Sequence, residues 1–190
     1  MNGTSPADSL WNDPKYRQGF WALIATQFQG AFNDNLLRAA VVFTLATMSA
    51  RLENWATGIS MALFNIPYIL FPAIAGALAD RYSKQRVIVA AKYAEIGIMF
   101  AGLLAFLFGS PLFTLAVLFL MATQSAFFSP AKYGILPEIL PESRLSWGNG
   151  VIQMWTFVAI IVGTAVTSPL LVLFGERIYL VSLVLMTLSV

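Results

Sequence analysis

Residues 17–48 read RQGFWALIATQFQGAFNDNLLRAAVVFTLATM, a mostly apolar stretch interrupted at its centre by F-N-D-N-L-L-R at 32–38. A membrane-spanning helix needs about 20 mostly apolar residues, so this stretch is long enough to cross a bilayer with a tilt or a bend. An ionised side chain at the bilayer centre costs about 2.5 to 3.5 kcal/mol on insertion scales. Asp34 and Arg38 therefore indicate a role that offsets this cost.

The composition of the whole chain supports a membrane location. Of its 190 residues 58% are hydrophobic and 11% are charged, and the mean hydropathy is +0.75. Soluble domains average about 45 to 50% apolar and about 25% charged residues. The net charge is only +2, and the basic residues form no long stripe, so we expect no nucleic-acid partner.

Two residue types are missing from the sequence. It contains no Cys and no His, which removes disulfides, thiolate and imidazole metal ligands, and the commonest general base. We therefore expect a protein that is not an enzyme and that needs neither a metal nor a cofactor.

Six apolar stretches predict an all-α membrane protein with a six-helix transmembrane bundle at 17–190. The predicted spans are 17–48, 57–79, 86–108, 112–129, 145–174 and 178–190. Residues 1–16 form a polar tail without the features of a signal peptide. The last stretch has only 13 residues, about 20 Å of helix, which is shorter than the bilayer core. We therefore expect the chain to be part of a longer protein.

The positions of Lys and Arg predict the orientation of the bundle. Alternate loops and the tail carry most of the basic residues, namely Lys15, Arg17, Arg81, Lys84, Arg86, Lys132 and Arg144. The opposite loops hold Arg51 beside Glu53, and Arg177 beside Glu176. Because cytoplasmic loops carry an excess of Lys and Arg, we expect the amino terminus to lie in the cytoplasm, with the lipid bilayer around the bundle.

One loop carries a family motif. Residues 76–87 read GALADRYSKQRV, which resembles the signature loop G-x-L-A-D-R-x-G-R-K between helices two and three of the major facilitator superfamily. Ser83 and Gln85 depart from that pattern. The resemblance implies the amino-terminal half of a twelve-helix transporter, whereas the alternative is an ordinary positively charged cytoplasmic loop. The residues that we expect to act in this loop and in gating are Gly76, which permits close helix packing, Asp80, Arg81, Lys84 and Arg86.

A second motif narrows the family. Residues 127–136 read FFSPAKYGIL, and Asn149-Gly150 follows further on. Together with F-N-D-N they resemble the lysophospholipid transporter branch of the superfamily, including forms fused to a phospholipid acyltransferase. The resemblance implies alternating-access movement of lysophospholipid, chiefly lysophosphatidylethanolamine, across the bacterial inner membrane, and a carboxy-terminal six-helix bundle as partner. The alternatives are the membrane domain of a transporter-acyltransferase fusion, or a facilitator for drugs or small solutes.

Helical periodicity places four residues of the first span on one face, namely Gln27, Ala31, Asp34 and Arg38. Asp34 and Arg38 are four residues apart, so they either neutralise each other or offer a carboxylate to an ammonium group and a cation to a phosphate. The residues that we predict along the substrate path are Gln27, Asn33, Asp34, Asn35, Arg38, Gln124, Asn149 and Gln153.

Four further features leave alternatives open. The polar face of span five, with Asn149, Gln153 and Thr156, either lines the cavity or forms hydrogen bonds between helices. Lys132 and Tyr133 lie at the cytoplasmic mouth, as substrate contacts or as an interfacial anchor pair. Glu95 either pairs with Lys92 or is a second ionisable site. Pro130 either ends or kinks span four.

Overall fold

The computed structural model describes residues 11–48, 50–174 and 177–189, and these ranges form helices and contain no strand. The helices are α2 (Pro14–Met48), α3 (Ala50–Leu70), α4 (Pro72–Arg81), α5 (Lys84–Phe108), α6 (Pro111–Gly134), α7 (Leu136–Ile139), the 3-10 helix η1 (Glu142–Arg144), α8 (Leu145–Phe174) and α9 (Tyr179–Ser189). Most of the predicted tail lies outside the described residues, as does Glu176. The side chains of Arg51 and Glu53 are likewise not described.

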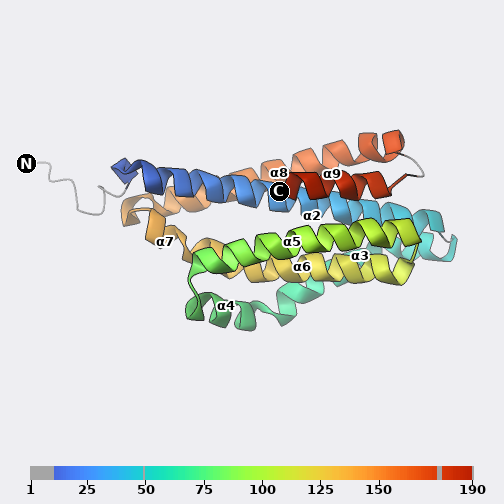
Figure 1. Ribbon diagram of the computed structural model, residues 1–190, viewed down its shortest axis with the longest axis horizontal. Helices are drawn as coiled ribbons and strands as arrows, with labels where there is room; N and C mark the ends of the chain where they lie inside the picture. The colour runs from blue at the N-terminus through green and yellow to red at the C-terminus, as the bar shows by residue number, and fades with distance from the viewer. Residues whose placement is uncertain (1–10, 49, 175–176, 190) are drawn as a thin grey trace, which may run out of the picture.

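The long helices lie side by side along the longest axis of the molecule (Figure 1). Helix α2 packs against α8, α3, α6 and α9, so it contacts more of the long helices than its neighbours do. Helix α5 packs against α6 and α9, while α3 and α4 lie against α6. The segment with the F-N-D-N motif is therefore surrounded by other helices.

Several helices have the length and composition of membrane spans. Within the described ranges three helical segments qualify, at Lys84–Phe108, Pro111–Ile139 and Glu142–Phe174, and a fourth does if the bent pair α3 and α4 is one span. Helix α2 is not among them, because the polar residues at 32–38 lower its hydropathy, and the described part of α9 has 11 residues. The chain is thus an α-helical, multi-pass membrane protein, although fewer than six spans qualify by apolarity alone.

The second predicted span consists of two helices. The chain bends by 49° between Trp55–Leu70 and Pro72–Arg81. Pro72 is the first residue of α4, where its fixed φ suits a helix start, and because it has no N–H it cannot donate the backbone hydrogen bond that would continue α3 into α4. At the break the Phe71 ring packs against Phe127 with centroids 5.8 Å apart. By contrast, α6 continues through Pro130 to Gly134, so Pro130 does not end that helix.

Two apolar clusters divide the interior. One surrounds Leu37, Met99, Leu118 and Leu185, and the other surrounds Phe20, Phe128, Leu140 and Ile152. Along α2 the first cluster begins at Leu36 and the second ends at Ile24. The residues between them, 25–35, include the amides and the carboxylate of the predicted substrate path. The fold therefore places a polar layer between two apolar ones.

Glycines allow α8 to approach its neighbours closely. A Cβ atom at Gly163 would lie 3.4 Å from the Phe32 carbonyl oxygen and 3.4 Å from the Asn35 Cβ, and one at Gly148 would lie 2.3 Å from a Leu140 methyl group. Small residues at such crossings are typical of membrane helices, which associate through close van der Waals packing. Gly76 makes no such close contact, because an added Cβ there would meet no atom of another described element within 4 Å. The expected close helix approach at Gly76 is therefore wrong for the described residues.

Candidate functional site

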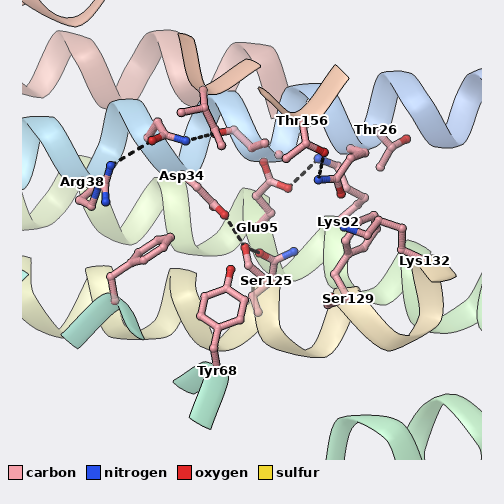
Figure 2. Close-up of a pocket in the computed structure, with 18 residues that line it drawn as sticks. Thr26, Asp34, Arg38, Tyr68, Lys92, Glu95, Ser125, Ser129, Lys132 and Thr156 are labelled. Carbon is pink, nitrogen blue, oxygen red and sulfur yellow. Dashed lines mark hydrogen bonds and ion pairs between the residues drawn. The ribbon is translucent and has the colours of Figure 1, made fainter. Parts of the chain in front are cut away.

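A polar cavity of about 360 Å³ opens within the bundle, between the two apolar clusters (Figure 2). Five helices contribute to its wall. The lining residues are Thr26, Gln27, Gly30, Ala31, Asp34, Asn35 and Arg38 from α2, Phe64 and Tyr68 from α3, Lys92 and Glu95 from α5, Gln124, Ser125, Phe128, Ser129 and Lys132 from α6, and Thr156 and Ile160 from α8. A volume in this range suits a small polar group rather than a whole lipid.

Asp34 is the carboxylate in the centre of this wall. Its side chain is only 8% exposed, and its Oδ2 accepts a hydrogen bond from Ser125 Oγ at 2.8 Å. Its Oδ1 is buried and has no hydrogen-bond partner among the described residues. In Figure 2 the Tyr68 hydroxyl points toward the Asp34–Ser125 contact. A buried carboxylate oxygen without a donor is costly, so Oδ1 is an acceptor that a ligand can satisfy.

Arg38 lies one turn further along α2 and has no carboxylate partner among the described residues. Its Nη2 donates to Asn35 Oδ1 at 3.1 Å, and its Cζ lies 5.4 Å from the centroid of the Phe64 ring. The ion pairs of the described chain are Lys84–Glu138 and Lys92–Glu95. Asp34 and Arg38 therefore do not neutralise each other in a salt bridge, and both face the same cavity.

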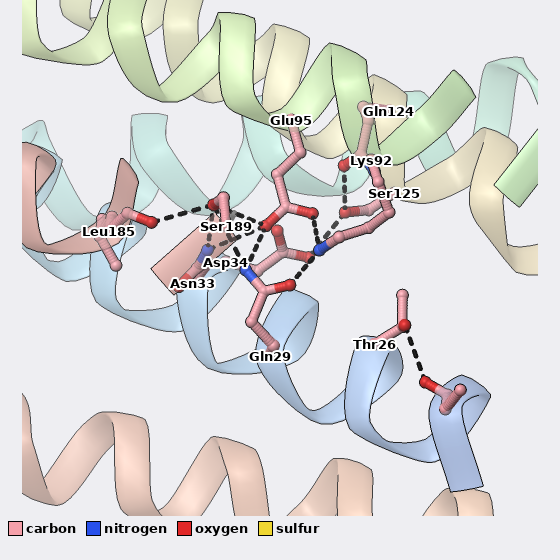
Figure 3. A network of polar contacts seen from close by, with 11 residues as sticks. Thr26, Gln29, Asn33, Asp34, Lys92, Glu95, Gln124, Ser125, Leu185 and Ser189 are labelled. Atoms are coloured by element: carbon pink, nitrogen blue, oxygen red, sulfur yellow. Dashed lines mark hydrogen bonds and ion pairs between the residues drawn. The ribbon is translucent and has the colours of Figure 1, made fainter. Parts of the chain in front are cut away.

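A second polar cluster closes one side of the cavity and links three helices (Figure 3). Glu95 on α5 is 1% exposed, and its Oε2 lies 2.6 Å from Lys92 Nζ. Its Oε1 accepts from Gln29 Nε2 and from Asn33 Nδ2, each at 2.9 Å. Lys92 Nζ also donates to Gln29 Oε1, and Asn33 Nδ2 donates to Ser189 Oγ on α9 at 2.8 Å. The cluster thus holds one positive and one negative charge and satisfies both within the fold.

Some of the residues predicted for the substrate path line the cavity, and others lie elsewhere. Gln27, Asp34, Asn35, Arg38 and Gln124 line the cavity, and Gln27 Nε2 also donates to Thr156 Oγ1 at 2.9 Å. Asn33 instead points into the Glu95 cluster, with its Oδ1 buried and unpartnered.

The two predicted residues of span five lie elsewhere. Asn149 is exposed and donates to the Leu145 carbonyl oxygen of its own helix at 3.1 Å. Gln153 is exposed and donates to the Tyr133 hydroxyl at 2.8 Å. Neither is among the residues of the cavity wall, and the Gln153–Tyr133 contact between α8 and α6 agrees with the other alternative, hydrogen bonding between helices.

Of the two residues predicted at the cytoplasmic mouth, Lys132 lines the cavity and Tyr133 does not. Lys132 is 7% exposed and lines the cavity, with its Nζ 4.6 Å from the centroid of the Tyr133 ring and 6.0 Å from that of Phe128. It has no carboxylate partner in the described part of the chain. Tyr133 is 36% exposed and lies outside the wall. Lys132 is therefore a cavity cation whose charge is met by aromatic rings.

The signature-loop residues lie outside the cavity. Lys84 Nζ forms an ion pair with Glu138 Oε1 at 2.7 Å, which joins the start of α5 to α7. Asp80, Arg81 and Arg86 are exposed. The ion pair of the loop thus reaches the segment that follows the FFSPAKYGIL motif, and its Ala79 and Val87 pack against Ala131 within that motif.

Several cavity residues were not predicted. Thr26, Ser125 and Ser129 are small polar residues in apolar helices, and only their spacing from Gln27 and Gln124 would have indicated them. Phe64 and Tyr68 belong to an apolar span in which nothing marks one aromatic ring as facing a cavity. Lys92 and Glu95 were expected chiefly as a structural pair, and they are paired but also line the cavity.

Taken together, the fold and the cavity define a class. The chain is a polytopic α-helical membrane protein with an internal polar site, which contains a buried carboxylate and two cations that have no carboxylate partner in the described ranges. Ionisable groups inside a membrane bundle mark a pathway or a binding site for a polar solute.

Known proteins resemble the chain closely enough to identify its relatives. It is 36% identical over 165 residues to the lysophospholipid transporter LplT of Serratia proteamaculans, a match that covers 86% of this chain and 38% of the relative. The protein of that name from Cronobacter sakazakii is 34% identical over 154 residues, covering 80% and 36%. That of Escherichia coli strain SE11 is 36% identical over 157 residues, covering 82% and 36%.

These similarities confirm the lysophospholipid transporter-like family that the motifs indicated. The chain spans less than half the length of the curated relatives it matches. No protein-family profile matches the chain. No solved structure matches it.

Proposed function

We propose that the chain is the amino-terminal membrane bundle of a lysophospholipid transporter in the bacterial inner membrane. The observation that carries this proposal is the polar cavity, in which, among the described residues, Asp34 Oδ1 has no donor and Arg38 has no carboxylate partner. A zwitterionic head group offers the two groups that this wall lacks, an ammonium and a phosphate. The names of the relatives, which are lysophospholipid transporters, support the same substrate class.

The head group would bind along α2. Asp34 and Arg38 are four residues apart, about 6 Å along the helix axis, and both line the cavity. The ammonium group would donate to Asp34 Oδ1, and the phosphate would accept from the Arg38 guanidinium, which suits phosphate geometry. Lys132 supplies further positive charge from α6. Ser125 holds the other Asp34 oxygen and so fixes the carboxylate for this contact.

Transport would require a second bundle. In the proposed mechanism two six-helix bundles rock around a site near the bilayer midplane, as in other twelve-helix facilitators. The matched residues cover only 36 to 38% of the relatives, which agrees with a chain that supplies one of the two walls. The carboxy-terminal bundle of the same protein, or of a form fused to an acyltransferase, would supply the other.

The amino terminus would face the cytoplasm. Two of the basic residues that we place on the cytoplasmic side make defined contacts. Lys84 pairs with Glu138, and the Arg144 guanidinium lies 5.1 Å from the centroid of the Trp11 ring. Through its Lys84–Glu138 ion pair, the signature loop would tie α5 to α7 during gating. These contacts support the orientation that the loop charges predict.

The proposal predicts that removing the Asp34 charge abolishes uptake. The full-length protein that carries this chain is reconstituted in vesicles, and the entry of labelled lysophosphatidylethanolamine is measured. We expect Asp34→Asn and Arg38→Ala each to lower uptake at least about tenfold, the effect of losing one charge-assisted hydrogen bond.

Asn149→Ala is the matched control, because Asn149 lies outside the cavity and should leave uptake unchanged. If both cavity variants insert into the membrane and take up the lipid normally, the proposal is wrong. Uptake of soluble amphiphilic drugs in place of the lipid would instead support a different facilitator.

A further inference from the structure

A second cavity lies outside the polar one, on the surface of the bundle. It is a groove of about 490 Å³ on α6, between α4 and α5. Its wall is almost entirely apolar and includes Leu78, Ala90, Ala94, Ile98, Leu120 and Phe127. Leu78 and Leu120 are 37% and 49% exposed at its rim. The groove is therefore open to the surroundings of the bundle.

The groove exists because of two local features. The chain bends by 49° where α4 begins, and Figure 1 shows α4 set apart from α5, with a short turn joining the two helices at one end. On α5 three of the six lining residues, Ala90, Ala91 and Ala94, have small side chains. Larger side chains there would fill the space. The bend and the alanines together leave a channel along the outside of the bundle.

One end of the groove carries an unpaired cation. Arg86 lines the groove and is exposed, and it has no ion-pair or hydrogen-bond partner among the described residues. Tyr82, also exposed, lines the same end. Nearby in sequence, Lys84 is paired with Glu138 and Arg81 lies beside Asp80, so Arg86 is the cation at this end that a ligand can reach. An anionic group that is attached to an apolar chain complements this arrangement.

The dimensions agree with one lipid leaflet. From Arg86 to Ile98 the groove follows α5 for about 18 Å at about 1.5 Å per residue. One leaflet contributes about half of the roughly 30 Å hydrocarbon core. A single acyl chain that starts at Arg86 would therefore reach close to the bilayer midplane within the groove.

We infer that this groove is a binding site for a bilayer glycerophospholipid, which places one acyl chain between α4 and α5 and its phosphate on Arg86. Guanidinium groups bind phosphate oxygens through paired N–H donors. The site is distinct from the polar cavity and does not depend on transport of the lipid it holds. The two cavities share one residue, Gln124, whose side chain lines both. A lipid in the groove would thus contact Gln124, which also lines the polar cavity.

The test is photolabelling in a defined membrane. The full-length protein is placed in nanodiscs of phosphatidylethanolamine and phosphatidylglycerol that contain a trace of phosphatidylglycerol with a diazirine on one acyl chain, and labelled peptides are mapped by mass spectrometry. We expect labels to concentrate on 86–98 and 120–127, rather than on the equally exposed apolar face of α8. Arg86→Gln should reduce that labelling about tenfold, as expected for the loss of one charge-assisted contact.

Two substitutions at exposed alanines separate binding in the groove from general lipid contact. Ala94→Phe fills the groove, whereas Ala165→Phe adds the same ring to the exposed surface of α8. We expect the first to abolish groove labelling and the second to leave it unchanged, with both proteins eluting as monodisperse species.

The inference is overturned if labels spread over α5, α6 and α8 in proportion to their exposed area. It is equally overturned if Arg86→Gln and Ala94→Phe label like the unmodified protein, or if a second copy of the chain is crosslinked over the groove in place of lipid. Because transport is not measured, loss of lysophospholipid uptake in an Asp34 variant would leave this outcome unaffected.

Discussion

Asp34 and Glu95 are both carboxylates inside the bundle, and their surroundings give them different roles. Glu95 accepts hydrogen bonds from four side chains, and one of them, the Lys92 ammonium, also balances its negative charge. Asp34 receives one donor, Ser125, and keeps a bare oxygen. A carboxylate that the fold has fully satisfied holds helices together, whereas one that it has left incomplete can bind a ligand.

The Glu95 cluster should therefore matter for stability. Glu95→Gln removes the negative charge and leaves the Lys92 ammonium without its partner, which typically costs about 3 to 5 kcal/mol for a buried pair. We expect a marked fall in the thermal unfolding temperature of the detergent-solubilised protein, followed by tryptophan fluorescence. The double variant Lys92→Met with Glu95→Gln should recover part of this loss. Equal stability of the single variant and the unmodified protein would show that the pair is not holding α2, α5 and α9 together.

Sequence reasoning found Asp34 and Arg38 because charges are rare in apolar stretches, and it placed Gln27 and Gln124 correctly at the cavity. It failed for Asn149 and Gln153, because periodicity places residues on a face of a helix without saying which way that face turns. It also missed Tyr68 and Ser125, since an aromatic ring or a small hydroxyl in a membrane helix is common. Only the packing of five helices shows which of them meet.

At the scale of helices, the apolar stretches at 86–108 and 145–174 correspond to α5 and α8, whereas α6 extends beyond the stretch at 112–129 to Gly134. The break at Phe71 was not predicted, although Pro72 could have indicated it. Pro130 shows why proline alone is ambiguous: α6 continues through it. A proline at the first position of a helix starts it, and one in the interior is tolerated where neighbouring groups compensate for the lost hydrogen bond.

The contact of α8 with the segment around α7 gives a prediction at this scale. A Cβ at Gly148 would lie 2.3 Å from Leu140 Cδ1 and 3.5 Å from Phe20 Cε2. Gly148→Ala forces the buried Leu140 side chain to move, and overpacking of this kind costs about 1 to 3 kcal/mol. We expect a lower unfolding temperature in detergent.

Gly150→Ala is the control on the same helix, because no atom lies within 4 Å of its Cβ position and alanine favours helix. It should be neutral or slightly stabilising. If both variants unfold at the same temperature, the close packing at Gly148 does not contribute to stability.

At the scale of the whole molecule, the orientation of the bundle in the membrane can be measured directly. The chain contains no Cys, so single cysteines can be introduced at two exposed positions that we place on opposite sides of the membrane, Gln85 at the start of α5 and Arg177 between α8 and α9. In intact cells a membrane-impermeant maleimide should label Arg177→Cys only, and Gln85→Cys should react after the inner face is opened. The reverse pattern would show that the amino terminus is not cytoplasmic.

The cavity is a half-site in our account, and the chain spans less than half of its relatives. Its five-helix wall already carries an acceptor for an ammonium group and two cations for a phosphate. The central claim is therefore that this wall recognises the head group, with Asp34 bound to the ammonium.

The most direct measurement is a cycle between Asp34 and that ammonium. Uptake of lysophosphatidylethanolamine is compared with that of its N-acetyl derivative, which lacks the positive charge, in the unmodified full-length protein and in Asp34→Asn. We predict that the unmodified protein prefers the charged lipid by about tenfold or more, the effect of one charge-assisted contact, and that Asp34→Asn loses this preference. If the variant keeps the full preference, Asp34 does not bind the head group and the account is contradicted.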